Sequence, residues 1–199
     1  MLYQKDIPIE QSALLVIDAQ DSFKLGPRWE RRDNRRFEEN VGSLIAAFRG
    51  AGRPVFFFLH TDPDPGFGSD HPAFKLMDFI RRRPEEPLLV KRTRNAFTGT
   101  DLAELLLERG VRRVVIAGIQ TEQCCETTAR LAADLGYAVD FVTDATMTFP
   151  IPHSDRPGEE LGVEAIRERT EYVLRGRFAR VRTADAVVKE LARVTPDTR

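Results

Sequence analysis

Cys124 and Cys125 are the only two cysteines of this 199-residue chain, and they stand side by side in the segment GIQTEQCCET (118–127). An apolar run ending in glycine precedes them, and a helix is predicted to begin there with Thr121 as its N-cap. Cys124 then falls in the first helical turn, where the positive end of the helix dipole lowers the pKa of a thiol. This position makes Cys124 a candidate nucleophile, although a free cysteine is more often a small buried hydrophobe.

A carboxylate and an ammonium group could complete such a site. Asp18 and Lys91 stand at the ends of two apolar runs, 13–19 and 87–91. A carboxylate can accept the proton of an attacking thiol, and a neighbouring lysine lowers the pKa of the thiol. Each residue alone has a simpler interpretation, as a turn aspartate or a solvated lysine. Together with Cys124 they predict nucleophilic chemistry, and we place neither of them in the core.

The elements that must position these residues are short, apolar, β-branched runs. Six are predicted to be strands: 13–19, 54–60, 87–91, 113–118, 138–145 and 179–183. Helical patterns separate most of them, and this alternation predicts an α/β fold, a three-layer α/β/α sandwich around a six-stranded, mostly parallel sheet. The strands read as apolar on both faces, as in sheets covered on both sides by helices. Such sheets bind ligands at the carboxyl ends of their strands, where His60 also ends a run and either lines the pocket or caps the sheet.

The length and net charge of the chain limit the number of domains and the class of partner. We expect one domain over residues 1–199, because two domains would each have a small core. Thirty basic and 31 acidic residues give a net charge of -1, which predicts small-molecule partners rather than nucleic acid or membrane. The first 20 residues lack the pattern of a secretory signal, and no apolar run is long enough to span a bilayer, so a cytoplasmic protein with free thiols is expected.

Three motifs together resemble those of the isochorismatase-like cysteine hydrolases, a family that includes nicotinamidases and N-carbamoylsarcosine amidases. LLVIDAQDSF carries Asp18, LVKRTRNAFTGTDL carries Lys91, and VVIAGIQTEQCCETTARLAADLGYAVDFVTDA is similar to the nucleophile segment of the family. The resemblance covers almost the whole chain. The family pattern of glycine, two residues, threonine, two residues and cysteine, counted from Gly118 and Thr121, selects Cys124 as the nucleophile.

The resemblance implies a cofactor-free hydrolase of a small amide, ureide or carbamoyl C–N bond that works through a thioester. Asp18, Lys91 and Cys124 would be its catalytic residues. It also implies a cis peptide bond between Ile119 and Gln120, which turns the Gln120 N–H toward the Cys124 N–H to form an oxyanion hole. A homo-oligomer, dimer or tetramer, is expected as well. The predicted substrate pocket is lined by Phe23, Trp29, His60 and Phe97.

The chain departs from the family at two places. Metal-binding nicotinamidases carry an aspartate, one residue and a histidine after the second strand, whereas HTDPDPGFGSDHP offers Asp62, Asp64 and His71 at a different spacing. We therefore predict no metal. Cys125 replaces a residue that is commonly aliphatic in the family, and we interpret it as a packing group.

Three segments and two rival functions remain open. Residues 26–36 join Trp29 to five arginines, and they form either a lid whose arginine meets a substrate carboxylate or, as we prefer, a solvated helix start. Residues 81–87 are interpreted as a solvated turn, and the long connection 148–162 as a functional loop or a subunit contact. The rival functions are isochorismatase-type vinyl-ether hydrolysis, which needs an aspartate but no thiol, and a non-catalytic binding protein.

Overall fold

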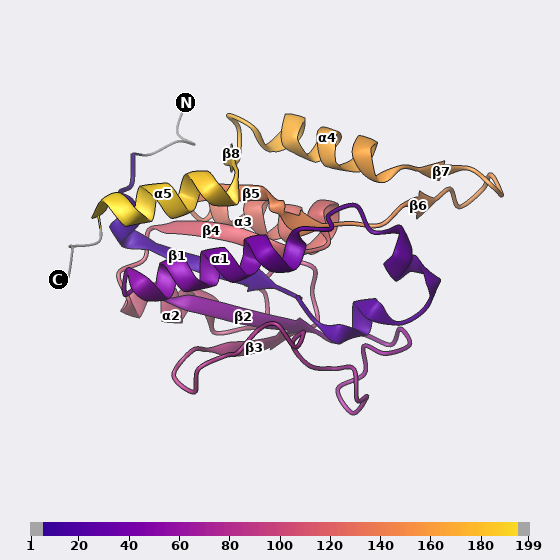
Figure 1. Ribbon diagram of the computed structural model, residues 1–199, viewed down its shortest axis with the longest axis horizontal. Coiled ribbons are helices and arrows are strands. Elements are labelled where there is room, and N and C mark those ends of the chain that lie inside the picture. The colour runs from indigo at the N-terminus through magenta and orange to yellow at the C-terminus, as the bar shows by residue number, and fades with distance from the viewer. Residues whose placement is uncertain (1–5, 195–199) are drawn as a thin grey trace.

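A six-stranded parallel sheet forms the centre of the computed structural model, which describes residues 6–194 (Figure 1). The strands lie in the order β3-β2-β1-β4-β5-β8. They are β1 (Ser12–Ile17), β2 (Val55–His60), β3 (Leu88–Lys91), β4 (Arg113–Ile119), β5 (Ala138–Met147) and β8 (Arg180–Arg182). Each corresponds to one of the six runs predicted from the sequence, so the predicted architecture is confirmed.

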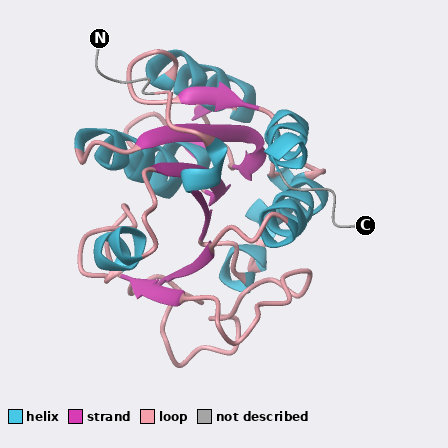
Figure 2. Cartoon of the chain, turned by 90° about the vertical axis from the view of Figure 1, so that its left-hand side faces the viewer, coloured by secondary structure: helices cyan, strands magenta, loops and turns pink. Residues whose placement is uncertain are grey.

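Helices cover both faces of the sheet (Figure 2). The helices are α1 (Phe37–Gly50), α2 (Leu102–Glu108), α3 (Glu126–Asp134), α4 (Val163–Leu174) and α5 (Ala184–Val194). Successive side chains of a strand point to opposite faces. Leu14 and Val16 of β1 therefore pack into a hydrophobic cluster with α1 and α5, while Leu15 and Ile17 pack into a second cluster with α2 and α3. None of the helices within residues 6–194 is long and apolar enough to cross a lipid bilayer.

The two edge strands correct the expectation that every strand is apolar and buried on both faces. Leu88 and Val90 of β3 are exposed, and all three residues of β8 are only half-buried. An edge strand has a neighbour on one side only, and Arg180 and Arg182 place charges on the β8 edge. The neighbouring turn, 81–87, is also less solvated than expected, because Glu86 is buried and pairs with Arg49 at 2.6 Å.

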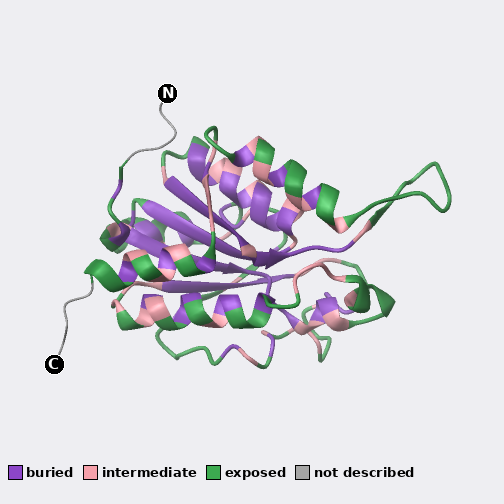
Figure 3. Ribbon diagram, turned by 45° about the horizontal axis from the view of Figure 1, so that its top comes forward, coloured by how far each residue is buried: buried purple, intermediate pink, exposed green. Residues whose placement is uncertain are grey.

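The connection after β5 forms a two-stranded arm. Its strands, β6 (Ile151–Pro152) and β7 (Glu160–Leu161), pair antiparallel and project from the body of the molecule (Figure 3). All four strand residues are exposed. The Glu160 carboxylate pairs with Arg31 at 2.5 Å, which ties the arm to the segment 26–36. The role of this arm as a functional loop or a subunit contact stays a prediction.

Candidate active site

The three predicted catalytic side chains meet at the carboxyl ends of β1, β3 and β4. Lys91 Nζ lies 2.7 Å from Asp18 Oδ2, and neither side chain is exposed to solvent. The Cys124 Sγ, a carboxylate oxygen of Asp18 and a ring nitrogen of His60 all lie within 4.8 Å of one another. Cys124 itself is only 4% exposed. The expectation that Asp18 and Lys91 lie outside the core is therefore wrong, because the two side chains form a buried ion pair.

Backbone conformation at two positions allows this approach. Asp18 directly follows β1 and has a φ of 47°, a left-handed conformation that aspartate tolerates better than most residues. Gly118 in β4 has a φ of 133°, and a Cβ there would lie 2.0 Å from the carbonyl oxygen of Ile17. Only glycine lets β4 pass β1 this closely, and the segment that follows carries Cys124.

The segment that carries Cys124 is a π-helical turn, η4 (Thr121–Cys125), rather than the start of an ordinary α-helix. The Cys125 N–H donates to the Gln120 carbonyl at 3.1 Å, five residues back, and α3 begins only at Glu126. The predicted N-cap is also wrong. Gln120 occupies that position, and Thr121 is the first residue of the turn, with its hydroxyl donating to Thr146 Oγ1 of β5 at 2.8 Å. The peptide bond between Ile119 and Gln120 is cis.

The loop after β3 holds the lysine and joins it to the nucleophile turn. Lys91 Nζ donates to the carbonyl oxygens of Thr93 at 3.1 Å and Arg94 at 3.3 Å. Further along this loop, the Ala96 N–H donates to Thr128 Oγ1 at 3.1 Å, and the Thr128 hydroxyl donates to the Cys124 carbonyl at 2.6 Å. The loop that binds the Lys91 ammonium group is thus also hydrogen-bonded, through Thr128, to the backbone of Cys124.

His60 belongs to the site rather than serving as a simple cap of the sheet. Gln20, itself buried, clamps the His60 backbone: its Oε1 accepts the His60 N–H at 2.7 Å and its Nε2 donates to the His60 carbonyl at 3.1 Å. The ring places Nδ1 3.4 Å from Lys91 Nζ and Nε2 2.9 Å from Asp62 Oδ2. Burial, followed by the positive charge of Lys91, lowers the pKa of His60, so the imidazole is neutral at physiological pH.

The thiol of Cys124 has an environment opposite to the one predicted. Burial raises its pKa to about 12, and the negative charge of Asp18 acts in the same direction. Lys91 lowers the pKa but does not outweigh these effects. The lysine and the helix start alone predict a lowered thiol pKa, but burial and the adjacent carboxylate outweigh them in the fold. Cys124 is therefore a neutral thiol at rest, and a base must remove its proton during attack.

Cys125 has the surroundings of a packing residue. Its side chain is fully buried in the cluster shared by α2 and α3. Burial, and then the neighbouring Cys124, raise the pKa of the Cys125 thiol well above its ordinary value. This environment suits an apolar side chain.

Two of the predicted pocket residues gather in an aromatic group beside the site. The Phe23 ring lies 5.0 Å from Phe67 and 5.9 Å from Phe149, and Trp29 lies 6.5 Å from Phe149. Phe67 in turn contacts the His60 ring at 6.3 Å, which links the aromatic group to the catalytic cluster. Phe97 packs elsewhere, with its ring stacked on Tyr137 at 5.8 Å. Its place in the substrate pocket stays a prediction.

The arrangement also includes charged residues that the sequence argument overlooked. Arg94 donates to His60 Nε2 and lies 3.4 Å from Asp62 Oδ2. Glu122, in the nucleophile turn, accepts the Thr148 hydroxyl at 2.6 Å, and burial raises its pKa. Both residues lie within three positions of a predicted catalytic residue in the chain. That proximity is the sequence feature from which their place near the site could have been predicted.

The segment after β2 that contains Asp62, Asp64 and His71 is not arranged to bind a metal ion. Asp62 is paired with His60 and Arg94, and its other oxygen accepts the Asp64 N–H at 2.9 Å. His71 is exposed, and its Nδ1 accepts an N–H of its own loop. The closer group of Asp18, His60 and Cys124 contains ligand types that zinc accepts, but the Lys91 ammonium lies against both Asp18 and His60 and supplies the positive charge there.

We therefore expect exhaustive chelation to leave turnover unchanged, because the cationic position beside Asp18 belongs to Lys91. Activity before and after prolonged chelator treatment, with metal content measured in parallel, checks this. A loss of turnover that zinc, iron or manganese restores would contradict it. An inert buffer incubation of the same length serves as the control.

Comparisons with known proteins identify the family of the chain. The isochorismatase domain model matches residues 12–177. The chain is 28% identical to the isochorismatase family protein YrdC of Bacillus subtilis, over 91% of this chain and 96% of that protein. It is 34% identical to nicotinamidase 3 of Arabidopsis thaliana, over 69% and 74% of the two chains. An isochorismatase-family structure from Chromobacterium violaceum, 26% identical, superposes with a TM-score of 0.85 over 98% of this chain and 99% of that one. The chain belongs to the isochorismatase family of hydrolases.

Proposed function

We propose that this protein hydrolyses the C–N bond of a small amide, ureide or carbamoyl compound, with Cys124 as nucleophile and a thioester as intermediate. The observation that carries the proposal is the position of a neutral, buried thiol beside the Asp18 carboxylate, which is itself paired with Lys91 at 2.7 Å. A neutral thiol needs an adjacent base to attack a carbonyl carbon, and Asp18 is that base. The relative named nicotinamidase is consistent with amide chemistry.

In the first half of the reaction, Cys124 Sγ attacks the carbonyl carbon while Asp18 takes the thiol proton. The backbone N–H groups of Gln120 and Cys124 hold the negative oxygen of the tetrahedral intermediate. When the C–N bond breaks, Asp18 gives its proton to the leaving nitrogen, and the acyl group remains on Cys124 as a thioester.

In the second half, a water molecule attacks the thioester carbon and passes a proton to Asp18. Collapse of the second tetrahedral intermediate releases the acid, and the proton returns to Cys124. Lys91 lies 2.7 Å from the Asp18 carboxylate and limits the free-energy cost of a buried negative charge there. Vinyl-ether hydrolysis would leave the thiol without a role, so the gathered thiol favours amide chemistry.

A panel of primary amides, ureides and carbamoyl compounds assayed for ammonia release tests the proposal. We expect release from at least one class, together with an acyl mass increment on the peptide that contains Cys124 when the reaction is stopped early. Release without such an increment, and with full activity after Cys124 is alkylated, would contradict the thioester route.

A further inference from the structure

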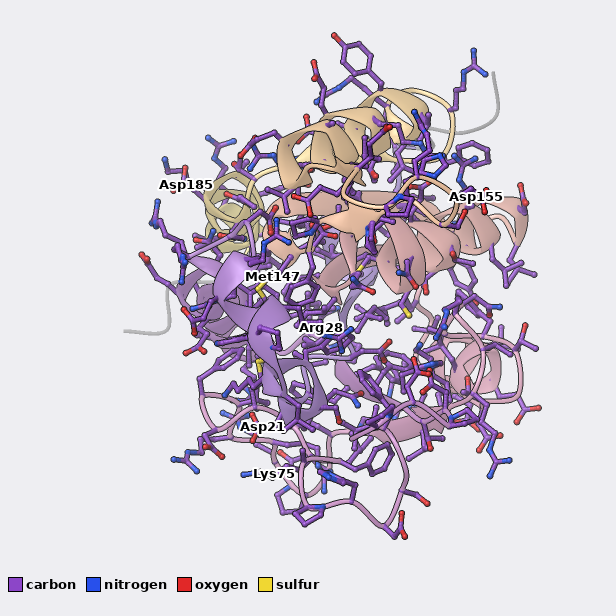
Figure 4. The ribbon with its side chains drawn as sticks, turned by 90° about the vertical axis from the view of Figure 1, so that its right-hand side faces the viewer. Asp21, Arg28, Lys75, Met147, Asp155 and Asp185 are labelled. Atoms are coloured by element: carbon purple, nitrogen blue, oxygen red, sulfur yellow. The ribbon has the colours of Figure 1, made fainter. Side chains whose placement is uncertain are left out.

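The side chain of Arg28 carries the inference. Arg28 lies in a short helical turn, η3 (Pro27–Arg31), and it stands near the middle of the face formed by the carboxyl ends of the strands (Figure 4). Its guanidinium lies over three phenyl rings, at 5.3 Å from Phe23, 5.4 Å from Phe149 and 5.7 Å from Phe67. A guanidinium can be attracted to aromatic rings through its positive charge and still donate its N–H groups to another partner.

The guanidinium has no hydrogen-bond or ion-pair partner among residues 6–194, although its pKa is lowered by burial. The residue as a whole is exposed, and its guanidinium is close to the three rings. The acids that affect it most, Asp64 and Asp62, act only through their charge. The other arginines of the same segment differ. Arg31 pairs with Glu160, and Arg32 donates to the Trp29 carbonyl and covers the Trp29 ring at 4.2 Å.

The phenyl ring of Phe67 is close to both the Arg28 guanidinium and the His60 ring of the catalytic group. Phe67 contacts the Arg28 guanidinium on one side and the His60 ring, at 6.3 Å, on the other. The His60 ring lies with Cys124 and Asp18 inside the 4.8 Å group. Phe67 thus lies between the Arg28 guanidinium and the residues gathered around Cys124.

We propose that Arg28 binds a carboxylate of the substrate, so that the compound hydrolysed is a small amide or carbamoyl compound that also carries a carboxylate. This inference rests on the proposed function and names its substrate class. A guanidinium matches a carboxylate through two parallel N–H···O bonds, and partial removal from water strengthens such bonds. The Phe23, Phe67 and Phe149 rings fix the guanidinium plane before the substrate arrives, which reduces the entropy lost on binding.

Matched pairs of substrates test the inference. Succinamate and butanamide are primary amides of equal length, with and without a carboxylate, and N-carbamoylglycine and N-propylurea form a second pair. We expect kcat/KM for the carboxylate member to exceed that of its neutral partner in the wild type. Arg28→Gln should lower this preference about 10- to 100-fold, the range of a lost charge-assisted hydrogen bond, and leave the neutral member nearly unchanged. Arg31→Gln removes a charge from the same turn and is the matched control, with the preference expected to persist.

A second readout does not depend on amide hydrolysis. Iodoacetate and iodoacetamide both alkylate Cys124 by displacing iodide, and they differ only in carrying a carboxylate or an amide. The ratio of their rates at Cys124, measured by peptide mass mapping, should fall about 10-fold or more in Arg28→Gln and stay constant in Arg31→Gln.

The outcomes separate the two proposals. If amides are cleaved and the ratio of kcat/KM for the carboxylate member to that for the neutral member is the same in the wild type and in Arg28→Gln, the carboxylate site is refuted while amide hydrolysis stands. If no amide is cleaved but the alkylation ratio falls in Arg28→Gln, the carboxylate site stands and the proposed function fails. An equal loss for both members of each pair would show that Arg28 only maintains the fold of the turn, and would refute its binding role.

Discussion

Replacing Cys124 by alanine is expected to lower kcat by at least about 10⁴-fold, because the atom that forms the thioester is lost. Far-UV circular dichroism and a denaturant titration should show a folded protein, since the change removes a single buried sulfur atom. Initial rates of ammonia release on the best compound of the panel provide the measurement. Substantial turnover by Cys124→Ala would overturn the assignment of the nucleophile.

Cys125→Val is the matched control for this experiment. The two cysteines are adjacent, but successive side chains of a helical turn point in different directions, and the Cys124 sulfur, not that of Cys125, belongs to the group with Asp18 and His60. Valine keeps an apolar group in the cluster where Cys125 is buried. We expect the variant to retain most of its activity. Alkylation should modify Cys124 before Cys125, but slowly at neutral pH, because the pKa of the Cys124 thiol is about 12 and that of Cys125 is also raised.

Asp18→Asn should affect turnover and thiol reactivity in opposite directions. The asparagine cannot accept the thiol proton, and we expect kcat to fall about 10²- to 10⁴-fold. The same change removes the negative charge that raises the pKa of Cys124, so the pH profile of alkylation should move to lower pH. Lys91→Met should move that profile to higher pH, because the lysine lowers the thiol pKa. Iodoacetamide rates between pH 7 and pH 11 measure both shifts.

The buried ion pair requires a control for stability. Asp18→Asn leaves the Lys91 ammonium buried without its partner, which costs about 3–5 kcal/mol in comparable cases. The double variant Asp18→Asn/Lys91→Met contains no buried charge at this pair and should recover much of the free energy of unfolding, while turnover stays lost. If activity returned together with stability, Asp18 would be a structural residue and the proposed base would be wrong.

Much of the fold follows from local patterns in the sequence. Runs of β-branched and aromatic residues such as VFFFLH in β2, alternating with helical segments, are sufficient for a parallel sheet, because this alternation has few compact solutions. The same logic places Asp18, His60, Lys91 and the start of the nucleophile segment at one edge, since all parallel strands end there. The spacing from Gly118 to Cys124 distinguishes between the two cysteines through resemblance to the family motif.

Other properties depend on distances across the sheet. The Thr121 hydroxyl, at the start of the π-helical turn, donates to the Thr146 hydroxyl of β5, and this contact exists only because β5 lies beside β4 in the folded sheet. The choice of Arg28 among the arginines of residues 26–36 depends on three phenyl rings that come from three separate segments.

The pKa of Cys124 shows most clearly what the sequence alone does not predict. From the sequence alone, Lys91 and a helix start predict a lowered pKa, whereas in the fold burial and Asp18 raise it to about 12. Residue types and their order decide which charges can meet at the edge of the sheet. Only the tertiary structure decides how far apart those charges lie and how much water remains between them, and the interaction energy of charges depends on these two quantities.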